Sequence, residues 1–233
     1  SSSSINVNVV VTLFCDKDGR LWVGTNRGLD RFDPATETFV HYPFPKNLHP
    51  RVSSIIQRRK DGVIMVGTAG YGVFSVGSDG KMKEVAFDPS DQFFSRFFED
   101  SRGRLWKSGF DDTIVMYDGK KRKMFHSAVG NPQAFVEYGD ELLVVCLHGL
   151  MSYHNGQMAV SDIDLGVAAE KEAVFNHATM TGDGSIYIGT RGQGLYRLAL
   201  NASRRLEHAE IDAAGVDPNT AKINCVMSDR GGN

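Results

Sequence analysis

The stretch from Asp16 to Asp33 constrains the fold most, because imperfect copies of it recur along the chain. It reads DKDGRLWVGTNRGLDRFD and combines two polar, glycine-containing turns with two short apolar runs. Asp side chains bond nearby backbone amides and Gly adopts a positive φ, so such turns join neighbouring antiparallel strands. The run Leu21-Trp22-Val23 is too short for a helix and is typical of a buried strand.

The copies follow one another at a period of about 40 residues. Gly19, Gly62, Gly103 and Gly184 are equivalent and lie 43, 41 and 81 residues apart, the last spacing covering two units. A weaker copy at 139–146 keeps the apolar strand but lacks the Gly-Thr pair. A repeat of this length built from short strands is the signature of a β-propeller. The sequence therefore predicts an all-β chain of four-stranded antiparallel blades.

We expect five complete blades and the start of a sixth, after a disordered start at 1–8. A seven-bladed ring at this period needs about 300 residues, so we expect the chain to be a fragment of such a ring. A closed five-bladed ring is the lesser alternative. The expected blades are 9–43, 52–87, 94–126, 133–160 and 175–211, with a partial blade at 221–233. Among the expected strands are 84–87, the outer strand of the second blade, and 223–227, the first strand of the sixth.

The stretch from Phe14 to Thr36 resembles the two-component regulator propeller repeat, with DKDGRLWVGT followed by GLDRFDPAT. The likeness runs from about Val9 to Asn233 and is strongest in the first and fifth repeats. This family forms the extracytoplasmic sensor of hybrid two-component systems in polysaccharide-degrading gut bacteria. The resemblance implies a periplasmic, ligand-sensing segment of a membrane-anchored histidine kinase that acts as a homodimer. It also implies an oligosaccharide ligand and regulation of polysaccharide utilisation genes.

Candidate ligand residues lie in the turns between second and third strands, which gather with the connections between blades at one face of a propeller. Aromatic rings stack on sugar faces, and planar polar groups hold hydroxyls by hydrogen bonds. Trp22 and Trp106 share one strand position with Met65, so we interpret them as blade packing. The candidate ligand-binding residues are Asn26, Arg27, Tyr71, Phe110, Asp111, Asp112, His148, Arg191 and Gln193.

The sequence favours a segment without catalytic residues, metal ligands or cofactor. The Asp of a sialidase box is separated from its Gly by one residue, whereas Asp18 adjoins Gly19, and there is no Gly-x-Ser-x-Gly elbow. Asp162-Ile163-Asp164 lacks the Gly and Glu of a calcium loop. Two alternatives stay open: a scaffold that binds a protein partner, and a lyase-like enzyme that uses His148, His154 or His177 with a metal.

Composition adds three expectations. With 26 basic and 28 acidic residues the net charge is −2, which indicates no basic face for nucleic acid. No run approaches the 18 or more apolar residues of a membrane helix. Cys15, Cys146 and Cys225 lie in apolar runs without paired spacing, so we expect three buried, unpaired thiols.

Overall fold

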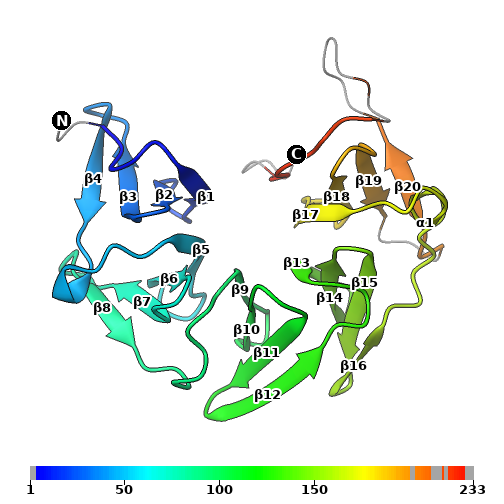
Figure 1. Ribbon diagram of the computed structural model, residues 1–233, viewed down its shortest axis with the longest axis horizontal. Helices are drawn as coiled ribbons and strands as arrows, with labels where there is room; N and C mark the ends of the chain where they lie inside the picture. The colour runs from blue at the N-terminus through cyan, green and yellow to red at the C-terminus, as the bar shows by residue number, and fades with distance from the viewer. Residues whose placement is uncertain (1–3, 200–202, 211–216, 218–219, 229–233) are drawn as a thin grey trace. The chain divides into compact units, whose positions relative to one another are not determined.

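The computed structural model describes the chain except residues 1–3, 200–202, 211–216, 218–219 and 229–233 (Figure 1). Its strands form five four-stranded sheets, and the strands of each sheet neighbour one another in sequence order. The fold class is confirmed: these are five antiparallel blades of a β-propeller. The helical elements of the described part are the short α1 (Val167–Glu170) and a 3₁₀ turn at Pro45–Asn47. None of the described helices is long and apolar enough to cross a membrane.

The blades belong to two compact units, which are described separately. The first unit comprises Ser1–Phe110 and Val115–Lys123, and the second comprises Asp111–Ile114 and Met124–Asn233. Blade 1 consists of β1 (Val10–Cys15), β2 (Leu21–Thr25), β3 (Gly28–Asp33) and β4 (Thr38–Tyr42). Blade 2 consists of β5 (Val52–Gln57), β6 (Ile64–Thr68), β7 (Val73–Val76) and β8 (Met82–Val85).

Blade 3 consists of β9 (Arg96–Glu99), β10 (Leu105–Ser108), β11 (Thr113–Asp118) and β12 (Lys121–His126). Blade 4 consists of β13 (Pro132–Tyr138), β14 (Glu141–Cys146), β15 (Gly149–His154) and β16 (Gln157–Val160). Blade 5 consists of β17 (Phe175–Met180), β18 (Ile186–Thr190), β19 (Leu195–Leu198) and β20 (Leu206–Ala209).

The repeated Asp at the start of each full motif both closes a turn and anchors a tryptophan. Asp16 Oδ1 accepts hydrogen bonds from the backbone N–H groups of Asp18 and Arg20, at 3.0 and 2.9 Å. Its Oδ2 accepts the indole N–H of Trp22 at 2.9 Å. Asp100 bonds the turn after β9 and the Trp106 indole in the same way, the latter at 2.8 Å. The carboxylate therefore satisfies a buried indole N–H that would otherwise lack a partner.

The repeated Gly-Thr pair closes the second strand of a blade. Thr68 Oγ1 donates a hydrogen bond to the Gly72 carbonyl at 2.7 Å and holds the turn after β6. A Cβ on Gly67 would lie 2.8 Å from the Cβ of Phe94, on the segment that leads into blade 3. Because real Cβ atoms do not approach so closely, only Gly lets this segment pass directly over β6.

Two apolar clusters lie between successive blades of the first unit. Trp22 and Trp106, exposed by only 3% and 0%, are core residues, which confirms that they pack and do not face solvent. Met65 occupies the equivalent place in blade 2 and packs against Phe94. The cluster between blades 1 and 2 contains Trp22, Leu29, Tyr42, Phe44, Val52, Ile55, Ile64, Val66, Phe74 and Met82.

A large apolar cluster of the second unit is shared by blades 4 and 5. Val145 and Leu150 of blade 4 belong to it together with Ile188 and Tyr196 of blade 5. Ala168 of α1 joins this cluster, so the short helix packs against the core. No helix was predicted in this connection between β16 and β17.

Three expectations are wrong in detail. The outer strand of blade 2 is Met82–Val85, two residues before the expected 84–87, because the buried Met82 pairs with Val76. Residues 223–227 form no strand, because they form no ladder with β17; the preceding Lys222 forms an isolated bridge with Arg191. Cys15 and Cys225 are exposed, and Cys146 alone is buried. Burial raises the pKa of the Cys146 thiol to about 11.

The turn expected at 228–233 lies almost wholly outside the described residues.

Candidate functional site

Each blade of the first unit carries different connections at its two ends. Because the strands are antiparallel and in sequence order, the turn between second and third strands lies at the same end as the connection to the next blade. We call this end the loop face. The other end, the hairpin face, carries the turns between first and second and between third and fourth strands. The predicted ligand residues all lie in loop-face turns.

Three exposed aromatic side chains mark the loop face of blades 2 and 3. Tyr71, Phe93 and Phe110 are 47%, 54% and 51% exposed, and every other aromatic residue in the described ranges is buried or half-buried. We call these three residues the aromatic platform. Exposed rings gathered in one place are unusual, since large apolar side chains normally contribute to the core. The platform is therefore the feature of this face that most requires explanation.

Backbone hydrogen bonds join two loops of the platform, and a ring contact links the third to them. The N–H groups of Gly70 and Gly72 both donate to the Gln92 carbonyl at 3.0 Å, and Ala69 forms a bridge with Phe93. The rings of Phe93 and Phe110 meet edge to face with their centroids 6.3 Å apart. The Tyr71 turn, the segment entering blade 3 and the loop after β10 thus form one connected surface.

Glycine shapes the turn that carries Tyr71. Gly70 has a φ of 99°, a conformation that L side chains rarely adopt. A Cβ at this position would lie 3.6 Å from the Phe93 ring, which is an ordinary van der Waals contact. The positive φ, and not a lack of room, is therefore what favours Gly here. The spacing of the aromatic groups is thus set by backbone geometry on ordered turns.

A buried ionic network fixes the segment that carries Phe93. Asp91, only 4% exposed, accepts from Lys107 at 2.8 Å and from Arg122 Nε at 2.7 Å, and it also bonds the Tyr117 hydroxyl. Lys107 donates in turn to the Phe93 carbonyl at 3.1 Å. Burial works to raise the pKa of Asp91, but the hydrogen bonds from Arg122, Lys107 and Tyr117 outweigh it and hold the pKa at about 2. Burial and the Asp91 charge raise the pKa of Tyr117.

The other predicted ligand residues make local contacts within their own units. Asn26 and Arg27 form the exposed β2–β3 turn of blade 1, where the Arg27 N–H donates to Thr25 Oγ1. In the second unit, Asp111 and Asp112 bond locally, to the Thr113 N–H and to His126. His148 is exposed in the β14–β15 turn. Arg191 contacts Asn176 and Gln193 contacts the Lys171 carbonyl, both within that unit.

Two histidines of the lyase alternative lie at different ends of blade 4, and the third, His177, lies on β17 of blade 5. His148 precedes β15 and His154 ends it, beside Asp140 at 3.5 Å. Six strand residues span about 20 Å, so these two rings cannot bind one metal ion. His177 Nδ1 accepts the Val226 N–H at 3.4 Å. No group of three or more His, Cys, Asp or Glu residues within the described ranges is placed to hold a metal.

Sequence reasoning missed Phe93. It identified the connection up to Gln92 as part of the loop face, yet the adjacent Phe93 and Phe94 cannot be told apart by composition. The structure buries Phe94 completely and exposes more than half of Phe93. The pair of Phe residues was the available signal for an exposed ring. Two successive side chains of an extended segment point to opposite sides, so only one of the two rings faces the core.

Comparisons with known proteins bear on the repeat and on the fold. Residues 4–27 match the family described as the two component regulator propeller. The chain contains a two-component regulator propeller repeat. The match ends at Arg27 and thus covers the first two strands of blade 1 and the first part of the stretch from Phe14 to Thr36. No curated protein sequence matches the chain.

Solved structures of similar fold come from several proteins. The extracellular domains of two proteins described as hybrid two-component systems from B. thetaiotaomicron align over 97% and 98% of this chain, with TM-scores of 0.74 and 0.71 at 18% and 16% identity. This chain spans 32% of each of them. An inactive virginiamycin B lyase from Staphylococcus aureus aligns over 96% of this chain and 77% of its own, with a TM-score of 0.72 at 16% identity. At these identities the likeness is one of fold.

Proposed function

We propose that this chain is a non-catalytic, ligand-sensing propeller segment of a two-component sensor, and that its aromatic platform binds an oligosaccharide outside the cytoplasm. The observation that carries the proposal is the gathering of Tyr71, Phe93 and Phe110 on one face. The two-component regulator repeat and the extracellular domains of similar fold support the sensor role. The histidine kinase, periplasmic location, dimer and target genes belong to the same proposal for the parent protein.

The platform suits a sugar because its rings are exposed and positioned by their loops. A sugar ring presents a face of C–H groups that an aromatic ring covers, while its hydroxyls need planar polar partners at the edge. Gln92 precedes Phe93 in the platform and supplies an amide group. Since the Gly70 and Gly72 amides already hold the loop, binding does not have to pay the cost of ordering it.

Signalling follows from differential binding. A ligand shifts a receptor between two arrangements only to the extent that it binds one of them more tightly. A platform built from three separate loops can bind a ligand with different affinity in two arrangements, because a movement of any one loop alters the spacing of the rings. The sugar then acts by favouring the arrangement in which the platform fits it best.

The test is a thermal-shift panel of defined plant and host oligosaccharides with the full chain, with and without a divalent metal. At 100 times Kd, binding adds about 2.7 kcal/mol of stability, so we expect a clear, metal-independent shift for one glycan class. Tyr71→Ala and Phe110→Ala should abolish the shift. Val40→Ala removes an exposed apolar side chain from β4 and serves as the matched control.

Other outcomes point elsewhere. A shift that survives in both platform variants places the sugar at another site and contradicts the proposal. No shift across the panel, together with capture of a protein partner that Tyr71→Ala abolishes, supports the scaffold alternative. Metal-dependent turnover of a glycan supports the lyase alternative.

A further inference from the structure

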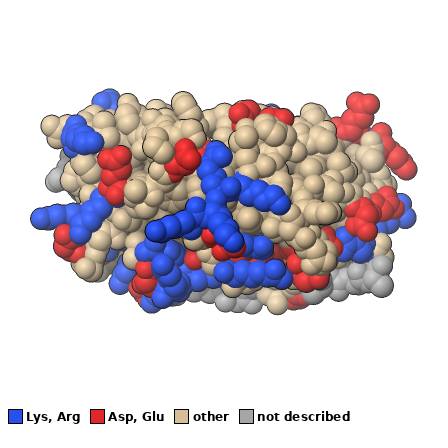
Figure 2. Space-filling model, turned by 90° about the horizontal axis from the view of Figure 1, so that it is seen from below, with Lys and Arg blue, Asp and Glu red and all other residues tan. Residues whose placement is uncertain are grey.

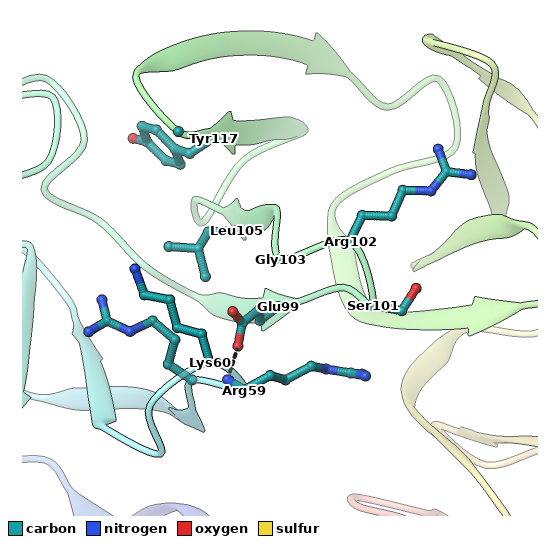
Figure 3. Close-up of a pocket in the computed structure, with 10 residues that line it drawn as sticks. Arg59, Lys60, Glu99, Ser101, Arg102, Gly103, Leu105 and Tyr117 are labelled. Atoms are coloured by element: carbon teal, nitrogen blue, oxygen red, sulfur yellow. Dashed lines mark hydrogen bonds between the residues drawn. The ribbon is translucent and has the colours of Figure 1, made fainter.

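A cavity of about 520 Å³ opens on the hairpin face between blades 2 and 3 of the first unit (Figure 3). Its rim is formed by the turns β5–β6, β9–β10 and β11–β12. It lies at the opposite end of these blades from the aromatic platform, and no predicted ligand residue lines it. Ligand sites for small molecules have volumes of about 300–1,000 Å³. The cavity is therefore large enough for a molecule of the size of a disaccharide.

Cationic side chains dominate the lining. Arg58, Arg59 and Lys60 come from the β5–β6 turn and Arg102 from the β9–β10 turn, against the single lining carboxylate of Glu99. Arg58 Nε and Nη2 donate to Asp61 at 2.9 and 2.6 Å. The four cations of the lining are thus accompanied by two carboxylates, Glu99 and Asp61, so the rim carries a net positive charge. Figure 3 shows Lys60 and Arg102 extending from different turns of the rim.

The turn that carries Arg59 lacks the carboxylate found at this repeat position in blades 1 and 3. Arg59 occupies the repeat position of Asp16 and Asp100, whose carboxylates close their turns and bond a Trp indole. Blade 2 has Met65 in place of that Trp, so it has no indole N–H to satisfy. Its turn closes through a backbone hydrogen bond from Gly62 to Arg58, and Glu99 of blade 3 accepts the Arg59 N–H. The turn of blade 2 therefore closes without the carboxylate that Asp16 and Asp100 supply in blades 1 and 3.

The surrounding surface extends the positive field. Directly after Gly119 on the rim come Lys120 and Lys121, and Lys123 follows on β12; all three are exposed. Figure 2 shows Lys and Arg side chains crowded together near the middle of the side viewed from below. In a chain of net charge −2 this is a local concentration. A cleft lined by one sign of charge attracts ligands of the opposite sign.

The cavity wall is also partly apolar. Leu105 and Tyr117 line it, and the Tyr117 hydroxyl is already bonded to Asp91, which leaves its ring as a contact surface. Arg and Lys groups bind carboxylate, sulfate and phosphate oxygens through charge-assisted hydrogen bonds. An apolar wall beside them fits the carbon skeleton of a larger ligand. The chemistry is that of an oxyanion attached to a small organic body.

We propose that this cavity is a second binding site that takes an oxyanion group, either of an acidic sugar or of a free anion. The site is independent of the aromatic platform. The test is calorimetric titration of the full chain with a sulfated disaccharide, its unsulfated counterpart and inorganic sulfate. We expect the sulfated sugar to bind and the neutral one to show no binding. Inorganic sulfate that binds as tightly as the sulfated sugar identifies a free anion as the ligand.

Two double variants of equal charge separate the cavity from diffuse surface charge. Lys60→Gln with Arg102→Gln should weaken binding at least tenfold, because both side chains line the cavity. Lys120→Gln with Lys121→Gln removes the same charge from exposed positions outside the lining and should change Kd less than twofold. Equal losses in the two variants, or equal binding of the neutral sugar, would overturn the proposal.

The platform variant Phe110→Ala keeps the two proposals apart. It should leave binding of the sulfated sugar unchanged, since Phe110 lies on the loop face. Loss of binding in this variant would assign the acidic sugar to the platform and overturn the cavity site. Absence of any binding by the sulfated sugar and by sulfate would also overturn it, whatever the outcome for neutral glycans.

Discussion

At the scale of single residues, the repeat is held by pairs that only the structure reveals. Asp16 with Trp22 and Asp100 with Trp106 form the same carboxylate–indole hydrogen bond in two blades. The sequence was sufficient to predict the turn and the burial of the Trp. It was not sufficient to predict the hydrogen bond between the Asp and the Trp. Blade 2 nevertheless changes both positions together, with Arg59 in place of the Asp and Met65 in place of the Trp.

This coupling gives a prediction for Asp100→Ala. The change removes the acceptor of a buried indole N–H, and an unsatisfied buried donor costs about 1–3 kcal/mol. We expect the free energy of unfolding, measured by urea denaturation, to fall by at least about 1 kcal/mol. Asp140→Ala removes a mostly exposed carboxylate and should have little effect.

A double-mutant cycle checks the mechanism. Once Asp100 is Ala, Trp106→Phe removes the orphaned donor, so this second change should cost less than it does in the natural chain. If the two costs simply add, the carboxylate and the indole are not coupled and the explanation of the repeat fails.

At the scale of elements, the sequence predicted most strands within two residues because each is bounded by Gly, Asp or Asn. It failed where no local signal exists. The shift of β8 to Met82–Val85 depends on which residue Val76 pairs with, and 223–227 lacks a ladder. Cys15 and Cys225 were predicted to be buried because their neighbours in sequence are apolar. Both thiols are exposed, because apolar neighbours do not show which side of a segment the core covers. For the candidate site, Tyr71 and Phe110 were predicted, but Phe93 needed the path of the connection.

The Asp91 network predicts that the entry to blade 3 is sensitive to acid. Asp91→Asn leaves Lys107, whose side chain is 6% exposed, without its carboxylate, and removing one partner of a buried pair costs about 3–5 kcal/mol. Since folding lowers the pKa of Asp91 to about 2, the charged form stabilises the chain above the unfolded pKa of about 4, and this contribution is lost as the pH falls towards 2.

Urea denaturation at several pH values measures this effect. The difference in unfolding free energy between the natural chain and Asp91→Asn should be largest near pH 7 and shrink between about pH 4 and 2. Asp118→Asn alters an exposed carboxylate on β11 and is the control. A difference that does not change with pH would show that the Asp91 charge does not stabilise the fold.

At the scale of the whole molecule, the blades of the first unit present different chemistry at their two ends. The loop face has exposed aromatic rings on connected loops, and the hairpin face has a cationic cavity. The overall composition, with nearly balanced charge, hides both features. We propose that a sensed oligosaccharide binds to the aromatic platform on the loop face.

The most direct test is amide hydrogen exchange of the full chain with and without a glycan that stabilises it in the thermal-shift panel. We expect amide exchange to slow on glycan binding at 69–72, 92–94 and 109–111, the segments that carry Tyr71, Phe93 and Phe110. We expect no change at 58–62 and 100–104, which line the hairpin face. Slower exchange at the hairpin face alone, or no change at the platform segments, would contradict the claim.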